Sequence, residues 1–154
     1  MRIPLILFIS MISLLADLKI GSNFPALQLV DQFDHNLSVP DQGNQTVMLS
    51  FERDVSSQIK NFLNTKNKGF LEERNVTYIS DISGMPSFVT SWFALPKMKE
   101  FHFKVGLIYD KNVGETLNRE EGKVTLIQLR DNTISSIKFV NPKELNTLLE
   151  FLQN

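Results

Sequence analysis

The feature that most constrains the fold is a strand, a helix and a second strand that follow one another between residues 46 and 82. Thr46–Phe51 (TVMLSF) and Val76–Ile82 (VTYISDI) are rich in apolar and β-branched residues, which predicts two buried strands. Between them, Asp54 is placed to cap a helix. The apolar residues of that helix recur at the spacing of one helical face: Val55, Ile59, Phe62 and Leu63. Such a crossover joins parallel strands and is right-handed.

Five more strands are predicted on the two sides of this unit. Asp131 and Asn132 separate the last two and favour a tight hairpin turn. A turn is also expected at residues 110–112 (DKN). The five strands are Ala26–Val30, Leu37–Val39, Lys104–Tyr109, Val124–Leu129 and Ile134–Val140.

A second helix is predicted from Pro86, which suits the first helical position, to Leu95, with Pro96 ending it. Its broad apolar face is interpreted as part of the core. An apolar contact surface at Trp92 and Phe93 is the alternative, if part of this face is exposed. The face consists of Phe88, Val89, Trp92, Phe93 and Leu95.

A last helix is predicted after Asn141, which caps it, with Pro142 in its first position and Glu144 completing a capping box. Its buried stripe is Leu145, Leu148, Leu149 and Leu152. The order of elements predicts an α/β fold, a mixed sheet with helices on both faces. Residues 21–154 are expected to form a single domain, because they contain no repeats and no low-complexity linker. The chain has 16 basic and 17 acidic residues, and this balance predicts no nucleic-acid partner.

The first 16 residues are predicted to be a signal peptide. Arg2 gives a charged start, and Ile3–Ala16 is an unbroken apolar or small stretch, shorter than the roughly 20 residues that span a bilayer. Cleavage after Ala16, or as late as about residue 20, predicts a periplasmic or secreted protein with no stable membrane insertion. An uncleaved anchor and a buried core helix are the alternatives.

The sequence contains no cysteine, which excludes disulfides, thiol catalysis and cysteine metal sites. His35 and His102 have no second ligand at metal-like spacing, so no metal site and no cofactor are expected. Ser56 or Ser57 as a nucleophile would need a base, and His102 is the one plausible candidate. Helix-capping serines are the simpler interpretation.

Two sets of residues resemble known families. Gly21–Asp31 (GSNFPALQLVD) resembles the opening of the peroxiredoxin and TlpA-like branch of the thioredoxin-like superfamily. Ser83–Val89, Val105–Gly114 and the last hairpin and helix resemble the YtfJ-type exported bacterial family, whose activity is uncharacterised. The resemblance covers most of the chain after its N-terminal segment. It implies a three-layer thioredoxin-like fold with an N-terminal β-hairpin extension.

The resemblance also implies where a reactive site would lie. In redox-active relatives the thiol stands at the start of the helix after the central strand, where the helix N-terminus lowers its pKa. Here Asp54 and Ser57 align with the two cysteines of a C-x-x-C motif. Redox-active relatives also carry a cis-proline before the strand that is Val124–Leu129 here, and residues 121–123 contain no proline. The resemblance therefore implies a redox-inactive protein.

A polar groove at the start of this helix is the candidate binding site. In a fold of this kind the loop before the strand 124–129 lies beside the helix, so residues 119–121 should approach residues 52–54. The interpretation that the sequence favours for these charges is a solvated ion-pair cluster that contributes little, and a groove that grips a peptide or a small anion is the functional alternative. The candidate residues are Glu52, Arg53, Asp54, Ser56, Ser57, Glu121 and Val124.

The function expected from this pattern is binding, as an accessory protein whose partner is another exported protein or a peptide. The alternative is an enzyme of non-thiol chemistry that uses Glu52, Asp54 and Glu121 as acid–base groups. A strongly raised carboxylate pKa in a closed cleft would favour the enzyme. A membrane-tethered structural protein is a third option, which requires that the N-terminal segment is not cleaved.

Overall fold

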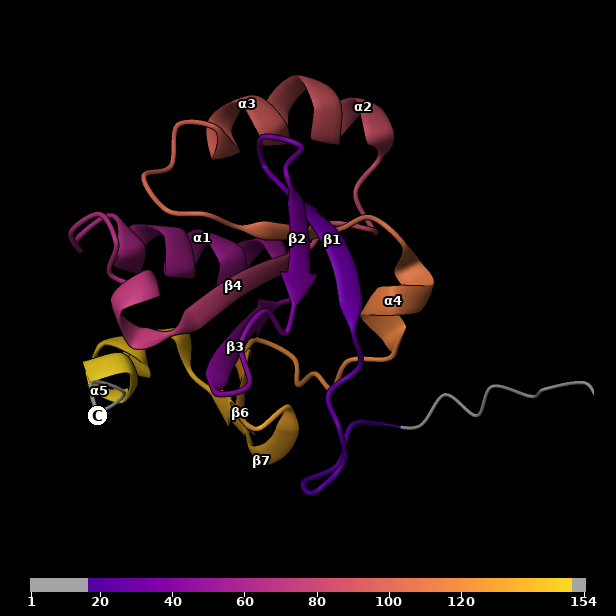
Figure 1. Ribbon diagram of the computed structural model, residues 1–154. Coiled ribbons are helices and arrows are strands. Elements are labelled where there is room, and N and C mark those ends of the chain that lie inside the picture. Colours follow the sequence, from indigo (N-terminus) through magenta and orange to yellow (C-terminus); the bar gives the residue numbers. More distant parts are fainter. Residues whose placement is uncertain (1–16, 151–154) are drawn as a thin grey trace, which may run out of the picture.

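The computed structural model describes residues 17–150, and the predicted signal peptide lies outside this range. Seven strands form one mixed sheet in the order β2-β1-β5-β4-β3-β6-β7 (Figure 1). This agrees with the predicted number of strands, and each strand lies within about two residues of its predicted limits. The strands are β1 (Leu27–Asp31), β2 (Asn36–Val39), β3 (Gln45–Ser50), β4 (Val76–Asp81), β5 (Gly106–Ile108), β6 (Val124–Arg130) and β7 (Thr133–Val140).

The centre of the sheet confirms the predicted crossover. β3 and β4 are parallel, with Thr46 opposite Val76 and Ser50 opposite Ser80. β5 continues the parallel arrangement beside β4, whereas β6 runs antiparallel to β3. The β6–β7 hairpin turns at Asp131 and Asn132, whose φ angles of 50° and 61° are those that a tight hairpin turn requires. The predicted turn is confirmed.

The β1–β2 hairpin extends the sheet at the β5 edge, as an N-terminal extension. One buried side chain attaches its turn to the rest of the protein. The Gln32 amide donates to the Phe103 carbonyl at 2.8 Å and accepts from the Val105 N–H at 3.0 Å. It also donates to the Met98 carbonyl at 3.4 Å. The hairpin turn is therefore fixed beside the segment that leads into β5.

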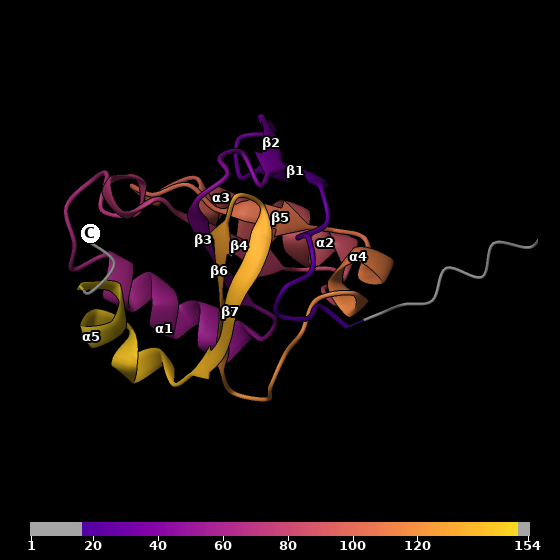
Figure 2. The ribbon, with the colours of Figure 1, turned by 60° about the horizontal axis from the view of Figure 1, so that its bottom comes forward.

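One face of the sheet is covered by α1 (Arg53–Leu63) and α5 (Leu145–Glu150), which lie side by side in Figures 1 and 2. Val55, Ile59 and Leu63 of α1 and Leu145 and Leu149 of α5 are buried in one apolar cluster. These are the predicted faces of both helices. Leu152, the last residue of the predicted stripe, lies outside the described residues.

The other face of the sheet is covered by a short helix and the N-terminal segment. The helix is α4 (Lys111–Glu115), where only a turn was expected. Asp110 caps it by accepting a hydrogen bond from the Asn112 N–H at 2.9 Å. Val113 of α4 packs against a second apolar cluster that includes Phe24 and Leu117. The predicted arrangement, helices on both faces of a mixed sheet, is confirmed.

The second predicted helix is present but does not end at Pro96. It consists of α2 (Ser87–Val89), a π-helical turn η2 (Thr90–Ala94) and α3 (Leu95–Met98). Pro96 stands at the start of α3, directly after the π turn. The helix is continuous at this point, because Ala94 and Leu95 are both helical and the Leu95 N–H bonds to the Thr90 carbonyl; the i→i+5 bonds of the π turn shift the backbone pairing, which lets a proline without an N–H follow. The prediction that Pro96 ends the helix was wrong.

The core interpretation of this helix was also wrong. Phe88, Trp92 and Phe93 are 62%, 76% and 57% exposed. Only Thr90 of this segment is buried, and Leu95 and Met98 pack partly against the α1–α5 cluster. The apolar residues of this helix therefore fall into two groups: a few pack against the core, and the aromatic ones are exposed.

Two predicted helix caps differ in detail. Glu52, and not Asp54, is the N-cap of α1, and Asp54 lies within its first turn. A carboxylate there still interacts favourably with the helix dipole. Asn141 caps the last helical segment as predicted, accepting from the Lys143 N–H at 3.0 Å. That segment starts with a 3-10 turn, η3 (Pro142–Glu144), and among the described hydrogen bonds none joins the Glu144 side chain to Asn141. Within residues 17–150, no helix is both long and apolar enough to cross a membrane.

Candidate functional site

Four hydroxyl groups meet where β3 and β4 end and α1 begins. Ser50 and Ser80 are opposite one another in the parallel register, and Tyr78 lies two residues before Ser80 on the same face of β4. Ser56 reaches them from the first turns of α1. Ser50, Ser80 and Tyr78 are buried, and Ser56 is half-buried. We refer to these four residues as the hydroxyl cluster.

The hydroxyl cluster is held by its own hydrogen bonds. The Ser50 Oγ lies 2.8 Å from the Ser56 Oγ, 2.9 Å from the Tyr78 hydroxyl and 3.3 Å from the Ser80 Oγ. Ser56 also donates to the Glu52 carbonyl at 3.0 Å. Because the hydroxyls satisfy one another, the buried polar groups cost little.

The chemistry of the hydroxyl cluster is limited by its surroundings. Burial raises the pKa of the Tyr78 hydroxyl, and its hydrogen bonds with Ser50, Ser56 and Ser80 offset only part of that rise. Tyr78 is therefore neutral at physiological pH. Among the described hydrogen bonds, no histidine and no carboxylate contacts any of the four hydroxyls. A serine nucleophile needs such a base.

The start of α1 and the loop before β6 are joined as predicted. The Glu52 carboxylate accepts a hydrogen bond from the Gly122 N–H at 2.7 Å, across 70 residues of sequence. Gly122 has a φ of 70°, which favours glycine. The loop carries no proline, and the cis peptide bond of the described chain is Val39–Pro40. The two segments thus form one continuous polar surface beside the hydroxyl cluster.

The predicted site residues separate into exposed and buried ones. Glu52, Arg53, Asp54, Ser57 and Glu121 are exposed on this surface. The side chain of Val124 is 0% exposed and belongs to the core, so it does not line a surface. Within residues 17–150, no ion pair joins the charged groups at residues 52–54 to those at residues 119–121. The expected ion-pair cluster is therefore wrong, and the contact is made by a backbone N–H instead.

Arg119 contacts Phe51, directly before the N-cap of α1, and Asp81 at the end of β4. Its guanidinium lies 3.7 Å from the Asp81 carboxylate and 4.3 Å from the centre of the Phe51 ring, and it donates to the Gly114 carbonyl at 2.6 Å. Asp81, which is almost fully buried, also accepts from the Ser83 N–H and hydroxyl. This network fixes α4 against the carboxyl end of the sheet.

Sequence reasoning found Ser56 but missed its partners Ser50, Tyr78 and Ser80. The signal was present in the strands, because Ser50 and Ser80 are polar residues at the ends of otherwise apolar runs. A polar residue on a strand predicted to be buried must find a hydrogen-bond partner. Only the register of the parallel pair, however, shows that the two meet.

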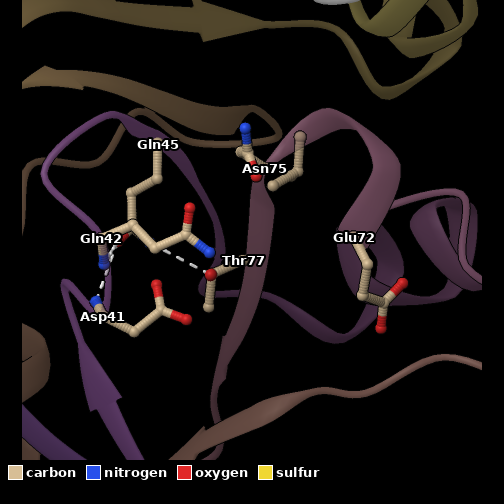
Figure 3. A pocket seen from close by; sticks show the side chains of 7 residues that line it. Asp41, Gln42, Gln45, Glu72, Asn75 and Thr77 are labelled. Carbon is tan, nitrogen blue, oxygen red and sulfur yellow. Dashed lines mark hydrogen bonds between the residues drawn. The ribbon is translucent and has the colours of Figure 1, made fainter.

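A shallow pocket of about 110 Å³ lies at the opposite end of the sheet, where β3 and β4 begin (Figure 3). Gln45 occupies its wall, accepting from the Asp41 and Gln42 N–H groups and donating to the Thr77 hydroxyl at 3.1 Å. The pocket is therefore separate from the candidate site. In open α/β sheets, ligands are bound at the carboxyl ends of the parallel strands, which favours the hydroxyl-cluster end.

The described part of the chain holds no group of three or more histidine, aspartate or glutamate side chains placed to hold a metal ion. His35 is exposed and lies 3.3 Å from Asp31, which is buried at the β1–β2 turn. This pair belongs to the turn and lies apart from the candidate site in the sequence.

No protein-family model matches the chain, and no curated protein matches it. Solved structures do match. The thioredoxin domain of a thiol-disulfide oxidoreductase from Bacteroides vulgatus has a TM-score of 0.59 at 15% identity, covering 88% of this chain and 99% of that one. A peroxiredoxin-like protein from Aquifex aeolicus has a TM-score of 0.57 at 13% identity, covering 89% of each chain.

A SCO1/SenC family lipoprotein from Bacillus anthracis is a third match, with a TM-score of 0.56 at 10% identity over 87% of this chain and 96% of that one. Identities this low bear on the fold alone. The matches and the mixed seven-stranded sheet with its parallel crossover together identify the fold. The chain is therefore an α/β protein with the thioredoxin-like fold, and it carries that fold without a single cysteine.

Proposed function

We propose that this chain is an exported, redox-inactive domain that binds another exported protein or a peptide and performs no thiol chemistry on it. The observation that carries the proposal is the hydroxyl cluster. At the carboxyl end of the central strands, it fills the interior with serine and tyrosine hydroxyls that bond to one another. The polar surface outside it remains exposed and free to make contacts.

The charges of that surface favour a basic partner. Glu52, Asp54 and Glu121 are exposed carboxylates, and Arg53 is the exposed cation among the candidate residues. Exposed charges of one sign attract a segment of opposite sign and raise its rate of association. Ser57, exposed on the next turn of α1, adds a hydrogen-bonding group. The partner we propose therefore presents lysine or arginine side chains.

Export is supported by the N-terminal segment, which has the charge and length of a signal peptide. In this proposal residues 1–16 are removed, residues 21–154 form the single mature domain, and its location is periplasmic or secreted. The likeness to a lipoprotein structure agrees with this. We also propose that the chain is related to the YtfJ-type exported family, which it resembles in sequence.

The enzyme alternative receives less support. Glu52, Asp54 and Glu121 are all exposed, and the described pocket encloses none of them. The Glu52 carboxylate is engaged by the Gly122 N–H. Acid–base catalysis by a carboxylate usually depends on burial that shifts its pKa, and exposed groups lack that condition.

A photo-crosslinking amino acid at Ser57 tests the binding proposal in the native compartment. The matched control places the same amino acid at Ser135, an exposed serine on β7. We expect one protein to be captured in clearly higher yield from position 57. The yield should fall when Glu52→Gln, Asp54→Asn and Glu121→Gln are combined. Equal capture from both positions would count against the proposed surface.

A further inference from the structure

Three aromatic side chains form an exposed row along α2 and η2. Phe88 and Trp92 are four residues apart, as are Trp92 and Pro96, and Phe93 and Lys97. Side chains at this spacing are neighbours on one side of a helix. All five are exposed, and Trp92 is the most exposed aromatic of the described chain at 76%. We refer to Phe88, Trp92, Phe93, Lys97 and Lys99 as the aromatic face.

The π turn explains why these rings point outwards. In a continuous α-helix, Leu95 would share the side of Phe88, because residues seven apart lie on one face. A turn with i→i+5 hydrogen bonds contains an extra residue and changes that phase. Here Thr90 is buried, while Leu95 and Met98 pack against the core cluster. Thr90, Leu95 and Met98 thus face the core, while the aromatic rings remain exposed to solvent.

The segment that carries the aromatic face has a net positive charge in the sequence, although the whole chain has a net charge of −1; the exposed Asp34 lies in the neighbouring β1–β2 turn, which Gln32 joins to Met98. Residues 82–109 contain three lysines, Lys97, Lys99 and Lys104, and one acidic residue, Glu100. All three lysines are exposed. A symmetric contact with a second copy would place lysines of one copy near those of the other. An anionic partner fits this surface better.

The residue types distinguish a lipid surface from an acidic protein. Lysine is depleted in protein–protein interfaces, where arginine is preferred. Tryptophan and phenylalanine beside lysine are instead the composition of helices that lie in the membrane interface. The aromatic face also lies on a helix surface, and the pocket beside Gln45 is formed by other residues. A face of this kind suits a flat surface.

We propose that the aromatic face docks on the surface of a bilayer that contains anionic phospholipids. Phe88, Trp92 and Phe93 enter the headgroup layer, and Lys97 and Lys99 interact with the phosphates. Such contact buries apolar area and adds electrostatic attraction, which are the two terms of interfacial binding. The opposite end of the molecule, with β7 and α5 at the bottom of Figure 1, remains in water.

The chain carries its own reporter, because Trp92 is its single tryptophan. The full chain is mixed with vesicles of phosphatidylglycerol and phosphatidylcholine, and with vesicles of phosphatidylcholine alone. With the anionic vesicles we expect Trp92 emission to shift to shorter wavelength and to be quenched by brominated lipid. The apolar segment Ile3–Ala16 can also bring the chain to vesicles, but only docking of the aromatic face moves Trp92 into lipid.

Variants separate the electrostatic contribution of the lysines from the contribution of apolar burial. Lys97→Gln with Lys99→Gln should weaken the Trp92 response about 30-fold in lipid concentration, from about 1 kcal/mol per lysine near an anionic surface. Lys138→Gln with Lys143→Gln, two exposed lysines on β7 and η3 and outside the aromatic face, should leave it unchanged. Phe93→Ser should weaken it about 10-fold through lost apolar burial.

Three outcomes would overturn the proposal. The chain could bind the vesicles while Trp92 emission stays constant, which would show that another part makes the contact. Trp92 emission could shift with protein concentration in the absence of lipid, which would assign the face to a second copy. The Trp92 response could also be the same with both kinds of vesicle and in both double-lysine variants. That result would show that docking does not depend on anionic lipid.

Discussion

The hydroxyl groups of Ser50 and Tyr78 lie 2.9 Å apart in a part of the core that is closed to solvent. Ser50 ends β3, and Tyr78 lies on the neighbouring parallel strand β4. Their contact links the two central strands below the start of α1. On the side covered by α1, the carboxyl ends of β3 and β4 are therefore occupied by mutually bonded hydroxyls, and the charged Asp81–Arg119 pair lies at the end of β4 outside this cluster.

Tyr78→Phe removes one hydroxyl from this cluster and keeps the ring. We expect the free energy of unfolding to fall by about 1 kcal/mol, because Ser50 retains Ser56 and Ser80 as partners. Urea denaturation measures the change. The matched control is Tyr109→Phe, because Tyr109 is the other tyrosine of the chain and is 47% exposed. A loss of equal size in both variants would argue against the cluster.

The ionisation of Tyr78 gives a second test of its burial. Its pKa is raised in the folded protein, so its contribution to stability is present below the unfolded tyrosine pKa of about 10 and is lost as the pH rises above it. In the Tyr109→Phe variant, an ultraviolet titration reports Tyr78 alone. We expect phenolate absorbance to appear together with unfolding. Phenolate that forms at about pH 10 in a still folded chain would contradict the burial.

Gly114→Ala tests the contact between α4 and Asp81. An added Cβ would meet the Asp81 carboxylate carbon at 2.9 Å and push the carboxylate away from Arg119. Alanine for glycine in a helix normally gains up to about 1 kcal/mol. We expect instead a loss of about 1–3 kcal/mol from the steric conflict.

Gly84→Ala is the matched control, because a Cβ at Gly84 would meet no described atom within 4 Å. Its effect on the midpoint of thermal unfolding should be small. If Gly114→Ala stabilises the protein as a free helix position would, the packing of α4 on Asp81 is wrong.

Asp31 makes the protein sensitive to acid. Burial raises the pKa of Asp31, but hydrogen bonds from the His35 and Phe33 N–H groups and the nearby His35 ring outweigh it, so the pKa lies below its usual range. Its contribution to stability is therefore present above the unfolded pKa of about 3.9 and is lost as the pH falls through the folded pKa.

Asp31→Asn should flatten the loss of stability below about pH 4 and cost about 1–3 kcal/mol at neutral pH. Asp34→Asn, an exposed neighbour in the same turn, should do neither. Denaturation curves recorded at neutral and acidic pH for both variants measure these changes in stability. An acid response that is unchanged in Asp31→Asn would exclude this carboxylate as its source.

The parts of the fold that depend on local sequence could be predicted. The strand–helix–strand unit follows from periodicity, and the turn at Asp131 and Asn132 from residues that tolerate a positive φ. α4 could not be predicted, because five residues with a glycine among them show no helical face. The outward rings of Phe88 and Trp92 depend on the π turn, which changes the phase of the pattern and has no sequence signal of its own.

For the candidate site, the sequence predicted which two segments meet but not all the side chains that gather there. The contact between the start of α1 and the loop before β6 follows from the fold, and the bond from Gly122 to Glu52 confirms it. The grouping of Ser50 with Ser80 depends on the register of strands 30 residues apart, which composition does not fix. Val124 was predicted to line the site but is entirely buried in the core, because the sequence did not show which of its residues face outwards.

The central claim is that this thioredoxin-like domain works by binding and without redox chemistry. Its most direct test is an assay of the purified full chain for insulin reduction and for peroxide consumption with a thiol donor. We predict rates that equal those of buffer, because the chain has no cysteine. A rate that rises in proportion to the concentration of the chain would contradict the claim.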